Sequence, residues 1–193
     1  MANIKVMIDP GRSPYDQNGG SSGYLEHKGM WLLSNYLAEE LQELGINTKL
    51  TRQQKEVVSL WERGRRAAEW EADFFISQHS NASGNGKKRS VESYYSVARP
   101  TDLSLANVIT AATSKVMNNT DLGGKTKTAI CNNKADFHTV IQSAQIGGVP
   151  HIILMVNGFH DNFEDEAFLS EDENLHQIAK AQANAIAIYF GVN

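Results

Sequence analysis

The chain has 193 residues, of which 41% are hydrophobic and 21% are charged, and its formal net charge is −4. This length and balance predict one globular domain over residues 1–193, with a core that needs no covalent cross-links. Lys87-Lys88-Arg89 is the densest basic run, so the sequence argues against a nucleic-acid-binding protein. The longest wholly apolar run, 152–156, is far shorter than the ~20 residues of a membrane span. The single cysteine, Cys131, excludes both an intramolecular disulfide and a Cys-rich zinc site.

Strand-like and helix-like segments alternate along the first half of the chain. Apolar and β-branched runs predict strands over 3–9, 46–52, 73–79 and 91–97, and helical periodicity predicts helices over 25–44 and 59–70. In the first helix, Leu33, Leu37 and Leu41 lie on one face, and Gly45 is placed to end the helix in a left-handed cap. Ser59 and Glu62 form a capping box that begins the second helix.

The second half of the chain continues the alternation. Thr101 is expected to cap a helix over 102–118, and a final helix is expected to begin at the capping box Ser170–Glu173 and to end before Gly191. Short strands are predicted over 127–131 and 137–142, and a buried strand over 151–156. The whole pattern predicts an α/β layered domain with a mostly parallel or mixed central sheet flanked by helices. In such sheets, ligand sites lie beyond the carboxyl ends of the strands.

Four segments at or near predicted strand ends carry polar side chains that suit a site. They are Ile8-Asp9-Pro10-Gly11-Arg12, then Glu26 at the start of the first helix, then Ser77-Gln78-His79-Ser80-Asn81-Ala82, and last Val156-Asn157-Gly158-Phe159-His160-Asp161-Asn162. In their order and residue patterns these segments resemble the zinc-dependent N-acetylmuramoyl-L-alanine amidases, which cleave peptidoglycan between N-acetylmuramic acid and L-alanine. The resemblance covers nearly the whole chain and includes Thr51-Arg52 and Val149-Pro150. It implies the amidase fold, a peptidoglycan partner and a family zinc ion.

The resemblance transfers the family's functional residues only in part. In the family, two histidines and a glutamate bind the zinc, and a second glutamate acts as general base. Glu26 and His79 match two of the ligands, but the first ligand histidine falls on Arg12 and the catalytic glutamate falls on Val156. The resemblance further implies a substrate groove lined by Asn81, Asn157, Phe159 and Asn162.

These departures act on two different parts of the family mechanism. A catalytic zinc usually has three protein ligands and an open water position, and an arginine has no lone pair to donate to it. Valine has no proton-accepting group, so Val156 cannot activate water. Hydrolysis is therefore expected to be lost or much reduced. We further expect Arg12 to pair with Glu26 where the zinc would lie.

The chain has other histidines that could supply the missing ligand. His138 is the best spare ligand, because it precedes a strand that borders the site in the family. His27 neighbours Glu26 on the helix and therefore points about 100° away from it. His27, His151, His160 and His176 are expected to be surface or packing residues.

Three functions stay open on the sequence. The first is a zinc amidase with an unexpected third ligand; the second is a pseudo-amidase that binds peptidoglycan without cutting it. The third is a structural or regulatory component of a phage particle or cell envelope. No signal peptide is visible at Met1, so we expect a protein that is cytoplasmic until release, as for a phage lysin, or in the envelope if it is exported by another route.

Overall fold

A single mixed sheet forms the centre of the molecule in the computed structural model, which describes residues 4–192. Its strands are β1 (Lys5–Pro10), β2 (Asn47–Leu50), β3 (Phe74–Asn81), β4 (Ser90–Tyr95), β5 (Thr120–Lys125) and β8 (His151–Phe159). The strand order is β2-β1-β3-β8-β4-β5, and each neighbouring pair is parallel except β4 and β8, which are antiparallel. The predicted α/β class with a mostly parallel sheet is therefore confirmed.

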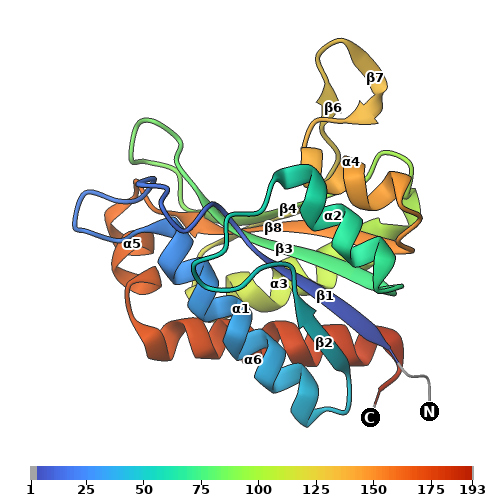
Figure 1. Cartoon of the computed structure of the whole chain (residues 1–193). Helices are drawn as coiled ribbons and strands as arrows, with labels where there is room; N and C mark the ends of the chain where they lie inside the picture. Colours follow the sequence, from blue (N-terminus) through green and yellow to red (C-terminus); the bar gives the residue numbers. More distant parts are fainter. Residues whose placement is uncertain (1–3, 193) are drawn as a thin grey trace.

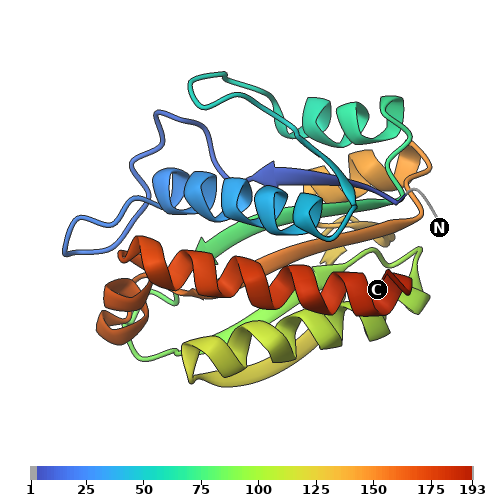
Figure 2. The ribbon, with the colours of Figure 1, turned by 90° about the horizontal axis from the view of Figure 1, so that it is seen from below.

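Helices cover both faces of this sheet (Figure 1). They are α1 (Glu26–Glu43), α2 (Leu60–Glu69), α3 (Leu103–Met117), α4 (Thr139–Ile146), α5 (Phe163–Leu169) and α6 (Asp172–Phe190). Helices α1, α6 and α3 lie side by side on one face, and α2 packs with α4 on the other (Figure 2). Within residues 4–192, none of the helices combines the length and the apolar character needed to cross a bilayer.

Alternation along each strand divides the core between the two faces. Ile8, Ile76 and Met155 pack toward α1, α3 and α6, whereas Phe75 and Val156 pack toward α2 and α4. The leucines predicted for the inner face of α1 are fully buried. Helix α1 also ends as predicted, because Gly45 has a φ of 78° and its N–H donates to the Gln42 carbonyl at 2.9 Å.

Several predicted elements differ from the structure. The strand predicted over 137–142 is wrong: this segment enters α4, where Val140, Ile141 and Ala144 pack at helical spacing against α2. Only Thr128–Ala129 (β6) of the strand predicted over 127–131 forms, in a hairpin with β7 (Asn132–Asp136). Strand β5 and helix α5 were not predicted.

Two of the predicted helix caps are also wrong. Pro100–Asp102 forms a 3₁₀ turn, so Asp102 rather than Thr101 precedes α3. The Ser170 hydroxyl donates to the Glu166 carbonyl at 2.8 Å, at the end of α5, and does not cap α6. By contrast, the Ser59 hydroxyl accepts from the Glu62 N–H at 3.2 Å, as predicted.

Three fully buried amides form a closed ring between the sheet and α6. Gln78 Nε2 donates to Gln182 Oε1 at 2.7 Å, Gln182 Nε2 donates to Asn157 Oδ1 at 2.8 Å, and Asn157 Nδ2 donates to Gln78 Oε1 at 2.8 Å. All three residues are 0% exposed, so these groups find their partners within the protein rather than in bulk water. The ring fixes α6 against β3 and β8 directly behind the ends of those strands.

Replacing Gln182 with methionine should lower the free energy of unfolding by about 2–4 kcal/mol, because it leaves the Gln78 amide donor and the Asn157 amide acceptor buried without partners. Gln177→Met, at an exposed position of the same helix, should change it by less than about 0.5 kcal/mol. Denaturant unfolding of both variants measures the difference. Equal effects would mean that the ring does not stabilise the fold.

Candidate functional site

The turn after β1 is built around the buried carboxylate of Asp9. Thr51 Oγ1 donates to Asp9 Oδ1 at 2.5 Å, Ser77 Oγ donates to Oδ2 at 2.6 Å, and Arg63 Nη1 donates to Oδ1 at 3.0 Å. Asp9 is 0% exposed and Arg63 is 2% exposed, so this ion pair is shielded from water. The end of β1 is thereby tied to β3, to the segment after β2 and to α2.

Backbone geometry then sets the direction of Arg12. Arg63 Nη2 donates to the Arg12 carbonyl at 2.7 Å, and Arg12 itself has a φ of 66°, in the left-handed region that few non-glycine residues adopt. A Cβ at Gly11 would lie 2.3 Å from the Gln78 carbonyl oxygen, so only glycine allows the turn to approach β3 this closely. The turn is thus held in an unusual conformation that aims the Arg12 side chain at the start of α1.

Glu26 is the centre of the candidate site. Its carboxylate, at the first residue of α1, is 0% exposed. Oε2 accepts from Arg12 Nε at 2.7 Å and from Asn18 Nδ2 at 2.6 Å, and Oε1 lies 2.9 Å from His79 Nδ1. The predicted pairing of Arg12 with Glu26 is therefore confirmed. The part of Asn18 was missed, because nothing in a Gly- and Ser-rich loop marks one amide as a partner of a carboxylate eight residues later.

The surroundings of Glu26 keep it ionised. Burial alone would raise its pKa, but the hydrogen bond and charge of His79, together with those of Arg12, lower the pKa to about 2. Near neutral pH the centre of the site is therefore a carboxylate neutralised by a guanidinium.

The residues present do not fit a catalytic zinc ion. Among residues 4–192, no three His, Cys, Asp or Glu side chains come together in a way that could hold a metal. Both oxygens of Glu26 and the Nδ1 atom of His79 already have hydrogen-bonding partners, and Arg12 supplies a positive charge rather than a lone pair.

His138, considered as the replacement ligand, reaches the same cavity but completes no ligand set. Its ring packs against Tyr94 and Phe137, with ring centroids 4.7 and 5.2 Å away, and its Nε2 atom is buried without a hydrogen bond among the described residues. Burial, followed by the nearby positive charges of His79 and Lys127, lowers its pKa to about 4. His138 is therefore a neutral wall residue at neutral pH.

A cavity of about 640 Å³ opens beside this centre. Arg12 and His79 lie at one side, and Tyr94, Lys127 and His138 come from β4 and the β6–β7 region. Val156, the position of the family's catalytic glutamate, contributes an apolar wall and is 3% exposed. The cavity therefore has a charged side and an apolar side.

Of the four residues expected in the groove, Asn81 alone lines this cavity. Asn157 is a correction, because it is fully buried in the amide ring on the opposite face of the sheet. Phe159 is also a correction, since it is 2% exposed and packs in the core, with Lys88 Nζ 4.2 Å from its ring centroid. Asn162 lies outside the cavity, where its side-chain Oδ1 caps α5 and its Nδ2 donates to the Gly86 carbonyl at 2.9 Å.

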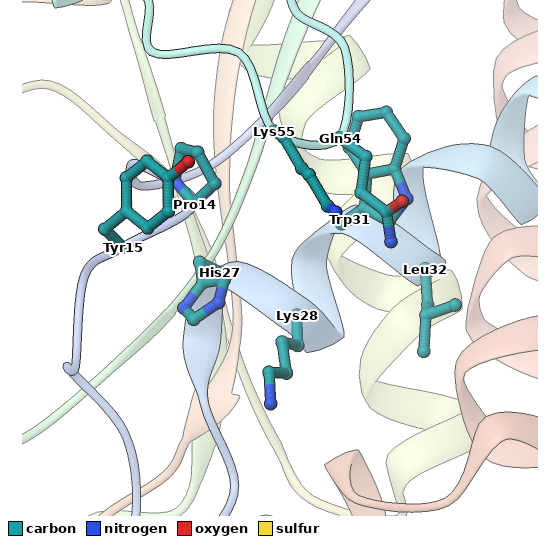
Figure 3. Close-up of a pocket in the computed structure, with 8 residues that line it drawn as sticks. All are labelled: Pro14, Tyr15, His27, Lys28, Trp31, Leu32, Gln54 and Lys55. Atoms are coloured by element: carbon teal, nitrogen blue, oxygen red, sulfur yellow. The ribbon is translucent and has the colours of Figure 1, made fainter.

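A second cavity, of about 450 Å³, lies on the other side of the loop that follows Arg12. Figure 3 shows Pro14, Tyr15 and His27 on one side of it and Trp31, Gln54 and Lys55 on the other. His27 Nδ1 donates to the Asp16 carbonyl at 2.7 Å, so this ring serves the loop and not Glu26. No sequence motif indicates this cavity, because its walls come from three separate segments.

The remaining histidines have structural partners, as expected. Nδ1 of His151 lies 2.8 Å from Asp102 Oδ1, and Nε2 of His176 lies 2.8 Å from Glu40 Oε1. His160 is fully buried, and its Nδ1 atom lies 2.8 Å from the Ser80 hydroxyl.

Comparison with known proteins places this geometry in a family. A sequence model described as N-acetylmuramoyl-L-alanine amidase matches residues 6–188. The chain is 31% identical to N-acetylmuramoyl-L-alanine amidase CwlM of Bacillus licheniformis over an alignment of 195 positions, which covers 98% of this chain and 70% of that protein. It is 29% identical to a sporulation-specific N-acetylmuramoyl-L-alanine amidase of Bacillus subtilis (strain 168), covering 98% of this chain and 69% of that protein. The structure of amidase AmiC2 of Nostoc punctiforme superposes with a TM-score of 0.83 at 26% identity, over 98% of each chain.

Breaking the buried ion pair of the turn should be costly. Arg63→Met leaves the Asp9 carboxylate buried without its cation, and we expect a loss of about 3–5 kcal/mol in the free energy of unfolding. Arg65→Met, on the exposed side of the same helix, should cost less than about 1 kcal/mol, because Arg65 pairs with the surface residues Glu62 and Glu69. Thermal and denaturant unfolding of both proteins test this, and similar losses would contradict it.

Glu26 should also give the fold a distinct acid sensitivity. Because its pKa falls from 4.5 to about 2 on folding, its contribution is complete above about pH 4.5 and is lost as the pH falls toward 2. The Glu26→Gln variant should therefore lose less stability than the parent between these pH values. Glu39→Gln, at an exposed position of the same helix, is the control and should follow the parent curve.

Proposed function

Because the chain belongs to the N-acetylmuramoyl-L-alanine amidase family, we propose that it binds peptidoglycan or its fragments in the cavity beside Arg12 without hydrolysing them. The observation that carries this proposal is the hydrogen bond of 2.7 Å between Arg12 and Glu26. In this ion pair, Arg12 occupies the position at which the family has a metal-binding histidine.

Two losses argue against hydrolysis, and each is sufficient. A metal-dependent hydrolase needs an ion that polarises the carbonyl and lowers the pKa of a bound water molecule, and this chain offers no three-ligand set for it among residues 4–192. It also needs a base within reach of that water, and Val156 presents only methyl groups to the cavity. Arg12 can stabilise negative charge, but it cannot accept a proton.

Retention of a ligand cavity argues for binding. The turn that carries Arg12 is held by a fully buried ion pair, and the cavity of about 640 Å³ keeps polar groups at its rim, including Asn81. Amide and guanidinium groups donate hydrogen bonds to the hydroxyl, carbonyl and carboxylate groups of which peptidoglycan consists. An active site that had collapsed after losing its function would keep neither the buried ion pair that holds the turn nor an open cavity.

A direct experiment separates binding from hydrolysis. The full chain is incubated with excess zinc, desalted and analysed for metal, and is then mixed with purified cell walls. We expect far less than one zinc per chain, co-sedimentation with the walls and no release of new amino groups. One retained zinc per chain with chelator-sensitive release of amino groups would establish the amidase instead, and His138→Ala would then identify its third ligand. Absence of both binding and release would contradict the proposal and favour a structural role.

The missing chemistry should be restorable by substitution. Arg12→His returns a histidine at a left-handed backbone position that histidine tolerates better than most residues, and it should create zinc binding without hydrolysis. Arg12→His combined with Val156→Glu should gain both zinc binding and release of amino groups, whereas Val156→Glu alone should gain neither. Zinc analysis and the wall assay read out all three proteins. Hydrolysis by the parent at the same rate as by the double variant would contradict this prediction.

A further inference from the structure

The charges around the cavity indicate which end of a peptidoglycan ligand it would hold. Resting on the binding function proposed above, we infer that the cavity recognises a free carboxylate on a carbon that bears a methyl group. Two ends of peptidoglycan carry this group: the lactyl side chain of N-acetylmuramic acid after its amide bond has been cut, and the terminal alanine of a stem peptide. The lactyl carboxylate is free only after the amide bond has been cut, so a ligand from that source would be a product of cell-wall cleavage rather than an intact substrate.

Arg12 has hydrogen-bonding capacity left for such a ligand. Its side chain is 38% exposed, and of its five N–H donors only the one on Nε is hydrogen-bonded within residues 4–192. Nη1 lies 3.7 Å from Asp16 Oδ2, which is an ion pair but too long for a hydrogen bond. The outer face of the guanidinium is thus the natural partner of an incoming carboxylate.

The other charges of the cavity favour an anion as well. Among the described residues that line it, Arg12, Arg63 and Lys127 are cationic and Asp16 is the anionic one. Arg63 is buried and paired with Asp9, so Arg12 and Lys127 are the cations that a ligand can reach. Glu26 is fully buried behind Arg12 and does not line the cavity. Lys127 is exposed, and its Nζ lies 3.8 Å from the Phe137 ring centroid without an ion-pair partner among the described residues.

An apolar wall completes the selectivity. Val58, Leu154 and Val156 line the cavity, and their side chains can accept a small alkyl group but offer no hydrogen bond. A carboxylate at position 156 would repel the ligand's carboxylate, whereas valine does not. Cations and an apolar wall in one cavity match a carboxylate that carries a methyl group on the adjacent carbon.

The test compares N-acetylmuramic acid with its lactyl carboxamide, which has the same shape and no charge. In a chemical-shift titration of the full chain, the acid should bind about tenfold or more tightly than the amide, since a charge-assisted hydrogen bond is lost. Arg12→Gln should bring this ratio close to one, and Lys127→Gln should reduce it several-fold. Lys55→Gln, in the second cavity, is the control and should leave the ratio unchanged. N-acetyl-D-alanyl-D-alanine, titrated in parallel, distinguishes the peptide source from the glycan source.

Each outcome bears on a separate claim. Equal binding of acid and amide by a protein that still binds cell walls would overturn the inference and leave the proposed function intact. A loss in Lys55→Gln as large as that in Arg12→Gln would also overturn it, because the anion would then occupy the second cavity. If the protein does not bind cell walls at all, both the proposed function and this inference are contradicted. If Arg12→Gln fails to fold, the ratio of acid to amide binding in the parent and in Lys127→Gln still tests whether the cavity recognises a carboxylate.

Discussion

The need to neutralise a buried carboxylate at the end of β1 organises this structure. Asp9 has no access to water, so three side chains from other segments must satisfy it. Arg63 does this and also donates to the carbonyl of Arg12, so one side chain both neutralises the core and orients the site. The position of Arg12, and with it the electrostatics of the cavity, follows from that requirement.

Most of the frame was predictable from sequence, because its signals are local. The apolar stripe of α1, the glycine that ends it and the capping box of α2 each depend on residues within a few positions of one another. The strand predicted over 137–142 failed because Val140 and Ile141 are equally suited to a buried strand and to a buried helix. Contact with α2 decides between them, at a point where a Cβ on Gly64 would lie 2.4 Å from the backbone nitrogen of Ala144. That contact has no local signature.

The candidate site was also predictable from sequence only in part. The pairing of Arg12 with Glu26 followed from their two ligand positions in the family resemblance and from their opposite charges, and it is present. The assignment of Asn157 and Phe159 to a groove failed, because alternation along β8 points Asn157 to the α6 face and the core packing around Phe159 covers its ring. Lys127 escaped notice because it reaches the cavity from a hairpin far along the chain. Sequence motifs therefore identified Arg12, Glu26 and His79 at the centre, while the part of Asn18 and the cavity walls depend on tertiary structure.

The closed ring of amides also couples the last helix to the end of β3, which carries His79. In a cycle where each amide donates to the next, no member can rotate without reversing all three, so the ring behaves as one mechanical unit. Gln78 directly precedes His79, so the last helix is linked through the Gln78–Gln182 hydrogen bond and one peptide bond to a residue that lines the cavity. A partner that pulls on the end of α6 would transmit its load to that side of the cavity. The last turns of α6 are thus coupled to the site, although they lie at the opposite end of the sheet (Figure 1).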